Sequence, residues 1–256
     1  MPGIKVSTMN YMAIEYAARH AWPSIEEKEL PYGVLRFAHG YTKRANSMTL
    51  YSAYRLNARE LVSQCEDFFC SRQQPAIVRI SPFASMGRID NYLSDCGYTI
   101  ADPSRVMIAP LRIHRVPRVH VLQVSRQAWL DAFYEIGGVN SEQREKHESL
   151  LHTISGRTLF ACLENDAGEP VCCAIGILFN DVLGIFNLAT SPAFKRRQFA
   201  TLMVDALLSW GRENQATYAF LQVNEINNAA ISLYAKMGFG TFYHYWYRIK
   251  NNETGR

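Results

Sequence analysis

The chain has 256 residues, of which 48% are hydrophobic, and carries a formal net charge of +4. That length allows one large domain or two ordinary ones with a sizeable core, and the composition is that of a soluble globular protein. Its cations are dispersed except in two stretches, Arg112 to His120 and Lys195 to Arg197. A nucleic-acid surface would be broader and interleaved with aromatic residues, so we expect no nucleic-acid partner.

The sequence also argues against a membrane protein and a metalloprotein. No window approaches the roughly 18 consecutive apolar residues of a membrane span, and the N-terminal stretch lacks a signal peptide's basic and apolar segments. The expected location is therefore the cytosol. Six cysteines form no C-x-x-C pair and no metal-ligand spacing with the seven histidines. Cys172 and Cys173 are adjacent in an apolar strand, so one side chain must face each way as a buried free thiol.

The first half of the chain alternates helix and strand patterns. In chain order these predict a helix over Asn57–Gln73, a strand over Pro75–Ile80, a helix over Ser85–Tyr98 that ends in glycine, and a strand over Ser104–Leu111.

The second half repeats this order after two leading strands. The predicted elements are strands over Pro170–Phe179 and Val182–Thr190, a helix over Phe199–Arg212, a strand over Thr217–Val223, a helix over Asn227–Phe239 and a strand over Thr241–Ile249.

Matching helix ends indicate an internal duplication. The segment Tyr92–Tyr98 reads YLSDCGY and the segment Leu233–Phe239 reads LYAKMGF, so both end in glycine followed by an aromatic residue. We place the boundary between Leu111 and His120, which gives domains 1–115 and 116–256. The alternative is that any α/β domain alternates helices and strands and that glycine is simply a common helix C-cap.

The segment Thr190–Met203, TSPAFKRRQFATLM, runs from a strand through three cations into a helix. Helix N-termini offer unpaired N–H groups and the positive end of a dipole, so this is a natural site for a phosphate. Phosphate loops usually contain glycine, yet Gln198 stands where we would look for it. With ordinary helical angles at Gln198, its N–H would stay available and only the Cβ would narrow the site.

Two motifs in this half resemble the GNAT superfamily of N-acetyltransferases. The family's loop, Arg/Gln-x-x-Gly-x-Gly/Ala, is occupied here by Lys195–Ala200, with glutamine in place of the first glycine. The family's later pattern, Asn-x-x-Ala-x-x-Leu-Tyr-x-x-x-Gly-Phe, is matched at every defined position by Asn227–Phe239. In the first half, Tyr32–Met48 is similar to a segment of a bacterial subgroup of tandem GNAT-like proteins. The resemblance implies an α/β (α+β) fold with two GNAT-like domains, each a mixed, mostly antiparallel sheet flanked by helices, of which the first is degenerate.

The resemblance further implies acetyl-CoA as cosubstrate. Backbone groups of the strand before the loop would contact pantetheine, and the loop and helix start would surround the pyrophosphate. Carried onto this sequence, the cofactor-binding residues are Leu188, Ala189, Thr190, Lys195, Arg196, Arg197, Gln198, Phe199, Ala200, Thr201 and Asn227. Asn227 has an alternative role as a helix N-cap.

The resemblance assigns Tyr234 as the general acid that protonates the leaving thiolate. Its alternative role is that of an aromatic core residue. A general base is harder to find, because the strand Val182–Thr190 contains no acid. We choose Glu164, although a solvated turn carboxylate is its alternative; a water relay or an amine of lowered pKa would make a base unnecessary.

In such proteins the first two helices and their loop set the specificity, here Gln127–His152, with Trp129, Phe133 and Tyr134 as candidate pocket residues and Gly137-Gly138 as a break. We expect a small-molecule or amino-acid-like amine as acceptor. The competing hypothesis is a non-catalytic CoA-binding sensor or scaffold. Whether the chain forms a homodimer stays open, because the aromatic run Phe242–Tyr247 could pair with another strand or bury in its own sheet.

Overall fold

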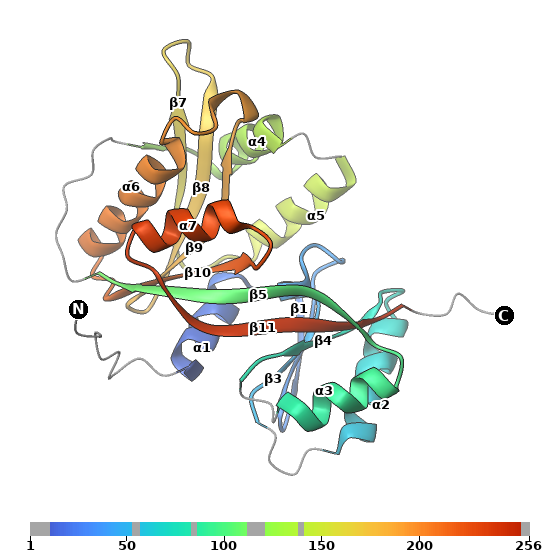
Figure 1. Ribbon diagram of the computed structural model, residues 1–256. Coiled ribbons are helices and arrows are strands. Elements are labelled where there is room, and N and C mark those ends of the chain that lie inside the picture. The colour runs from blue at the N-terminus through green and yellow to red at the C-terminus, as the bar shows by residue number, and fades with distance from the viewer. Residues whose placement is uncertain (1–10, 53–56, 83–85, 112–120, 138–140, 252–256) are drawn as a thin grey trace, which may run out of the picture.

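The computed structural model describes residues 11–52, 57–82, 86–111, 121–137 and 141–251. Within these residues a single eleven-stranded sheet runs through the molecule (Figure 1). From edge to edge its strands are β1 (Glu26–Leu30), β2 (Gly33–Phe37), β3 (Met48–Leu50), β4 (Ala76–Ile80), β11 (Gly240–Lys250), β5 (Thr99–Pro110), β10 (Tyr218–Asn224), β9 (Val182–Thr190), β8 (Pro170–Phe179), β7 (Arg157–Glu164) and β6 (Leu122–Gln123).

Helices cover both faces of the sheet. They are α1 (Tyr11–Ala21), α2 (Ala58–Cys70), α3 (Met86–Asp95), α4 (Arg126–Gly137), α5 (Ser141–His152), α6 (Phe199–Glu213) and α7 (Asn228–Lys236), with short 3-10 turns at Lys43–Ala45 and Pro192–Phe194. None of the helices in the described ranges is long and apolar enough to cross a membrane.

The same pairing pattern occurs twice. β1, β2 and β3 are antiparallel neighbours, and β4 lies parallel to β3 after the crossover through α2. β7, β8 and β9 are likewise antiparallel, and β10 lies parallel to β9 after the crossover through α6. The helices that follow, α3 and α7, both end near a glycine with positive φ, Gly97 and Gly238. A separation into domains 1–115 and 116–256 stays a prediction, since the boundary segment 112–120 lies outside the described residues.

The two repeats exchange their last strands. β11 pairs with β4, and β5 pairs with β10, while β5 and β11 run antiparallel to each other across the middle of the molecule (Figure 1). Helix α1 adds a further link, because it packs against β8 and β9. The aromatic run Phe242–Tyr247 lies within β11, which pairs with β5 along this run and with β4 only from Trp246 onward. The side chains of Tyr243, Tyr245 and Tyr247 are buried in the protein's own core. A homodimer stays a prediction.

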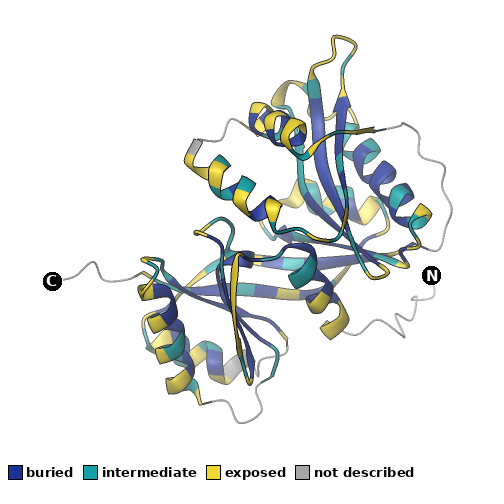
Figure 2. Cartoon of the chain, turned by 180° about the vertical axis from the view of Figure 1, so that it is seen from behind, coloured by how far each residue is buried: buried dark blue, intermediate teal, exposed yellow. Residues whose placement is uncertain are grey.

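Three apolar clusters form the core. One joins α1, α4 and α5 to one face of β8, β9 and β10, and a second joins α6 and α7 to the opposite face. The third lies under α2 and α3. The strands at the centre are buried and the outer faces of the helices are exposed (Figure 2). Cys173 belongs to the first cluster and Cys172 to the second, and both are free thiols, which confirms the prediction that they face opposite ways.

The predicted elements from Asn57 onward are present with shifted ends. Asn57 is the N-cap of α2, since its side chain accepts hydrogen bonds from the backbone N–H groups of Arg59 and Glu60. The strand predicted over Ser104–Leu111 begins earlier, at Thr99, because the polar segment Thr99–Ser104 pairs with β11 although it lacks an apolar pattern.

Candidate active site

β9 and β10 separate after a short parallel contact. They pair only at Val182, Leu183 and Gly184 of β9, opposite Tyr218–Phe220 of β10. Beyond Gly184, β9 continues beside β8 as far as Thr190. A β-bulge interrupts that second pairing, and Asn187 within it has a positive φ of 50°. Backbone groups on the edge of β9 that faces away from β8 are therefore available to a ligand over the last part of the strand.

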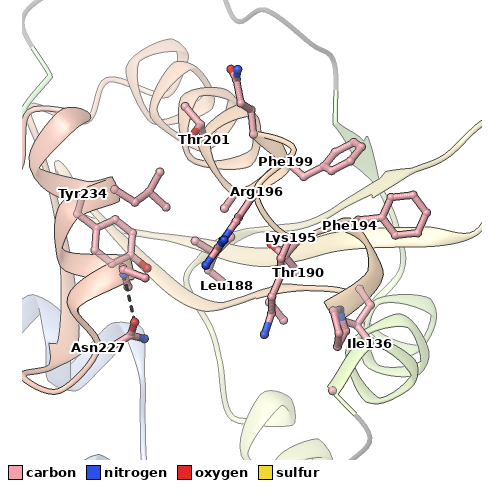
Figure 3. Close-up of a pocket in the computed structure, with 18 residues that line it drawn as sticks. Ile136, Leu188, Thr190, Phe194, Lys195, Arg196, Phe199, Thr201, Asn227 and Tyr234 are labelled. Carbon is pink, nitrogen blue, oxygen red and sulfur yellow. Dashed lines mark hydrogen bonds between the residues drawn. The ribbon is translucent and has the colours of Figure 1, made fainter.

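A pocket of about 850 Å³ opens at this point, between the end of β9 and the starts of α6 and α7. Every predicted cofactor-binding residue except Arg197 lines it, together with Tyr234: Leu188, Ala189, Thr190, Lys195, Arg196, Gln198, Phe199, Ala200, Thr201 and Asn227. In Figure 3, Tyr234 lies across the pocket from Thr190, with Arg196 between them. Ile136 and Gly137, at the end of α4, are also part of the lining.

The basic loop has an unusual backbone. Gln198 is the N-cap of α6 in a left-handed conformation, with φ 67° and ψ 1°, and Arg196 also has a positive φ of 63°. The condition of ordinary helical angles at Gln198 is therefore not met. Position 198 is one where glycine would be unstrained, and a side chain there costs about 1 to 2 kcal/mol. Gln198 therefore has the left-handed backbone conformation that glycine adopts without strain, and its side chain makes this conformation unfavourable in free energy.

The three cations of the loop do not share one role. Lys195 and Arg196 line the pocket, whereas the guanidinium of Arg197 lies 5.3 Å from the centre of the Phe194 ring. Both arginines are exposed. Arg196 can therefore contribute charge to an anion in the pocket, and Arg197 packs on the aromatic ring beside it.

Tyr234 is nearly buried in the pocket wall. Only 8% of the residue is exposed, and its ring makes an edge contact with Phe239 at 6.0 Å. Burial, together with the nearby Cys172, raises the pKa of the Tyr234 phenol to about 12. The hydroxyl therefore keeps its proton at neutral pH, as a proton donor must.

Asn227 caps α7 and also lines the pocket, so its role as a cofactor contact stays a prediction. Its side-chain oxygen accepts a hydrogen bond of 3.1 Å from the backbone N–H of Ala230, which caps α7 (Figure 3), and the same residue lines the pocket. Capping fixes the start of the helix that carries Tyr234.

Glu164 lies away from the other predicted site residues. It is exposed at the end of β7, where it pairs with Pro170 beside the turn to β8, and it does not line the pocket. The described residues that line the pocket include no aspartate, glutamate or histidine. The structure thus favours the turn-carboxylate alternative over the assignment of Glu164 as a base.

A buried polar cluster next to the bulge was missed by sequence reasoning. His147 of α5 has no exposed surface; its Nε2 accepts a hydrogen bond of 2.8 Å from Asn187, and its Nδ1 lies 3.2 Å from the Tyr134 hydroxyl. The ring of Tyr41, from the first half of the chain, stacks on His147 at 4.5 Å. Burial lowers the pKa of His147 to about 3, so the imidazole is neutral.

The candidate specificity residues divide between this cluster and the core. Tyr134 belongs to the cluster, whereas Trp129 is fully buried and donates a hydrogen bond of 3.0 Å to the carbonyl of Ala174. Phe133 stacks on Trp129 at 5.0 Å. Gly138 lies outside the described residues.

Comparisons with known proteins agree with this geometry. The family model described as "Probable histone acetyltransferase Rv0428c C-terminal" matches residues 8–248. The chain belongs to this family. A similar curated protein is the uncharacterized N-acetyltransferase YobR of Bacillus subtilis (strain 168), which is 26% identical over 244 residues, 93% of this chain and 97% of the relative.

Solved structures show the fold. A GCN5-related N-acetyltransferase from Kribbella flavida superposes with a TM-score of 0.70 at 15% identity, covering 95% of each chain. A tandem GNAT protein from the clavulanic acid biosynthesis pathway superposes with a TM-score of 0.61 at 13% identity, covering 82% of this chain and 74% of its own. The chain is therefore an acetyltransferase with the GNAT fold.

Proposed function

We propose that the protein transfers an acetyl group from acetyl-CoA to the amine of a small, amino-acid-like molecule. The observation that carries the proposal is that Tyr234 and the start of α6 line one pocket beside the diverging strands. The first is a buried proton donor and the second is an anion site, and an acyl-CoA needs both at opposite ends of its pantetheine arm.

The pocket suits acetyl-CoA in volume and in polarity. Its volume of about 850 Å³ lies within the usual range of about 300 to 1,000 Å³ for cofactor sites. Lys195, Arg196 and the first turn of α6 would hold the pyrophosphate through positive charge and N–H donors. The edge of β9 from Leu188 to Thr190 would hold pantetheine through backbone hydrogen bonds.

In the proposed reaction, the neutral amine nitrogen forms a bond to the thioester carbonyl carbon, and the bond from that carbon to sulfur breaks. The amine proton leaves to water. Tyr234 donates its hydroxyl proton to the departing sulfur and then regains a proton from solvent, so the products are an amide and the free thiol of CoA. Burial keeps Tyr234 protonated before transfer, because its pKa is raised to about 12.

In this proposal, solvent water accepts the proton of the amine. No carboxylate or histidine is found among the described residues of the pocket lining. His147 is close to the bulge, but a pKa lowered to about 3 makes its neutral ring a weak base. An acceptor whose amine is partly neutral at the working pH meets this requirement.

Coverage by the first half of the chain supports a small acceptor. Tyr41 stacks on His147, and the guanidinium of Arg44 lies 5.6 Å from the centre of the Phe186 ring on β9. These residues cover the strand gap on the face opposite α6 and α7. A protein substrate would need that face open.

The test combines binding with turnover. Calorimetric titration should show acetyl-CoA binding at one site, and a panel of small amines should release CoA thiol in its presence. A histone-tail lysine peptide serves as the comparison substrate. Absence of acetyl-CoA binding would contradict the site, and binding without thiol release from any amine would favour the sensor. A higher kcat/KM for the peptide than for every small amine would rule out the small acceptor.

A further inference from the structure

A second, smaller cavity lies on the other side of the strand gap. It measures about 20 Å³, enough room for a single water molecule or one oxygen-bearing end of a ligand. Its walls come from α1, the first-half strands and β10, and four arginines take part: Arg19, Arg36, Arg44 and Arg79. None of these residues lines the pocket of Tyr234.

Arg79 lines this cavity and has two hydrogen-bond donors without a partner among the described residues. Its side chain is 5% exposed, and Nη1 donates to the Glu15 carboxylate, which is itself 4% exposed. Nε and Nη2 are buried and have no hydrogen-bond partner among the described residues. The guanidinium also lies 4.1 Å from the centre of the Tyr245 ring, so the group is held in place. A buried guanidinium with two open donors is costly unless an acceptor fills the cavity.

The charges around the cavity do not cancel. Arg19 pairs with Glu27 and Glu29, and Arg36 pairs with Glu27. Arg79 pairs with Glu15. The four guanidinium groups therefore face three carboxylates, which leaves one positive charge. No carboxylate in the described part of the chain lies within ion-pair distance of Arg44, so the excess charge is best placed there.

A rigid loop positions Arg44. The side-chain oxygen of Asn46 accepts hydrogen bonds from the N–H groups of Ala38 and Gly40, at 2.7 and 2.9 Å, and its nitrogen donates to the carbonyls of Tyr41 and Thr42, both at 2.8 Å. Asn46 is itself buried. The loop is thus fixed from within, as a binding site requires and a solvated turn does not.

The cavity lies close to the strand gap that the Tyr234 pocket also borders. Gln222 of β10 is part of its wall and lies two residues past Phe220, where pairing with β9 ends. On β9, Arg44 contacts Phe186, and Leu188 already lines the Tyr234 pocket. A strand rises about 3.3 Å per residue, so about 7 Å of strand separates the two contacts. A small molecule can span that distance.

We propose that this arginine-lined cavity binds the carboxylate of the acceptor, so that the substrates are amino acids rather than simple amines. The inference rests on the proposed acetyl transfer. One net positive charge matches a single carboxylate, which can accept two charge-assisted hydrogen bonds from Arg79 and attract Arg44.

The experiment uses amine pairs that differ only in a carboxylate: alanine with ethylamine, phenylalanine with phenethylamine, and lysine with 1,5-diaminopentane. Binding to the full chain without acetyl-CoA is measured by ligand-observed NMR, and thiol release is measured with acetyl-CoA. We expect the wild-type protein to bind at least one amino acid ten or more times more tightly than its decarboxylated partner.

Arg44→Gln should reduce this preference to less than threefold, and so should the double variant Glu15→Gln, Arg79→Gln, which removes a buried pair without leaving one charge alone. Lys43→Gln is the matched control, since Lys43 belongs to the same turn but pairs with Asp102 at 2.6 Å, outside the cavity. It should keep the preference. If the double variant does not fold, Arg44→Gln decides alone.

The outcomes separate the two proposals. Equal binding of both members of every pair, or a preference that survives in Arg44→Gln, overturns the carboxylate site and leaves a cavity that holds only water. Thiol release without carboxylate preference supports acetyl transfer and rejects the carboxylate site. Carboxylate preference without thiol release from any amine supports the site and rejects acetyl transfer.

Discussion

Gly184 and Phe220 are the last residues at which β9 and β10 pair, and the Phe220 ring lies where a side chain at position 184 would be. A Cβ on Gly184 would be 2.9 Å from Phe220 and 2.5 Å from Phe186. Both rings are buried and contact each other edge to face at 5.9 Å. The missing side chain at Gly184 therefore lets two aromatic rings fill the point where the strands part.

The variant Gly184→Ala tests this packing. The added methyl group must displace two enclosed rings, so we expect the free energy of unfolding, measured in urea, to fall by about 1 to 3 kcal/mol. The control is Gly176→Ala on β8, where the nearest atom is the end of the Leu207 side chain at 3.1 Å. A smaller loss is expected there, and equal losses would mean that the junction of β9 and β10 has no special packing.

The variant Gln198→Gly tests the strain in the basic loop. Glycine removes a left-handed cost of about 1 to 2 kcal/mol but adds about 0.4 to 1 kcal/mol of entropy to the unfolded chain. We expect a net stabilisation of about 0.5 to 1 kcal/mol in thermal or urea unfolding, with acetyl-CoA affinity retained. Gln198→Ala keeps the Cβ and should show no gain. If alanine stabilises as much as glycine, the glutamine side chain and not the backbone is the source of the cost.

Arg196 and Arg197 form a natural pair for testing the pyrophosphate site. Arg196 lines the pocket and Arg197 lies over Phe194, so removal of the first should weaken acetyl-CoA binding and removal of the second should not. For Arg196→Ala we expect a 5- to 20-fold rise in the calorimetric Kd, the lower part of the range for a charge-assisted bond because the side chain is exposed. For Arg197→Ala we expect a change of less than twofold. The reverse order would mean that the loop turns its other face to the cofactor.

Tyr234→Phe should separate catalysis from binding. Loss of the proton donor should lower kcat by about 100-fold, while the Kd for acetyl-CoA changes by less than twofold, since the ring remains to pack against Phe239. A matched loss of both would indicate a packing role. Because the pKa of Tyr234 is raised to about 12, the wild-type kcat/KM should rise with pH as the acceptor amine loses its proton and should not fall again below pH 10.

His147 should make stability depend on acidity. The native pKa is lowered to about 3, whereas an unfolded histidine titrates near 6.5, so between these values only the unfolded chain gains the proton. The free energy of unfolding should be unaffected by this residue above pH 6.5 and should fall below it, by up to about 1.4 kcal/mol per pH unit.

Urea unfolding of the wild type and of His147→Gln at pH 7.5, 6 and 5 measures this contribution. Glutamine can still accept a hydrogen bond from Asn187 and donate one to Tyr134, so the variant should lose less stability on acidification than the wild type. Parallel curves for the two proteins would show that other groups cause the acid sensitivity.

Local patterns predicted the fold of the second half well, because strand alternation, helix spacing and the Asn227–Phe239 motif all depend on residues that are neighbours in the sequence. The left-handed angles of Gln198 could not be predicted, since glutamine has no preference for them and the surrounding fold imposes them. His147 was missed for a similar reason. It lies on a helix whose sequence is polar, and only the fold brings it to Asn187 and Tyr41.

Arg79 shows the same limit at the second cavity. In the sequence it is one cation in an apolar strand. Its surroundings in the structure are formed by Glu15, by Tyr245 from the far end of the chain, and by a loop that Asn46 holds. No short pattern links these residues. The sequence shows the similarity of Tyr32–Met48 to tandem GNAT-like proteins, but only the fold brings Arg44 of this segment to Phe186.

The position of β11 between β4 and β5 sets the order in which the protein can be completed during synthesis. The edges of β4 and β5 emerge from the ribosome long before the strand that joins them, since β11 ends at Lys250. Until then the early half has an open sheet and cannot finish folding by itself. Contacts of such large sequence separation also predict slow refolding after dilution from denaturant.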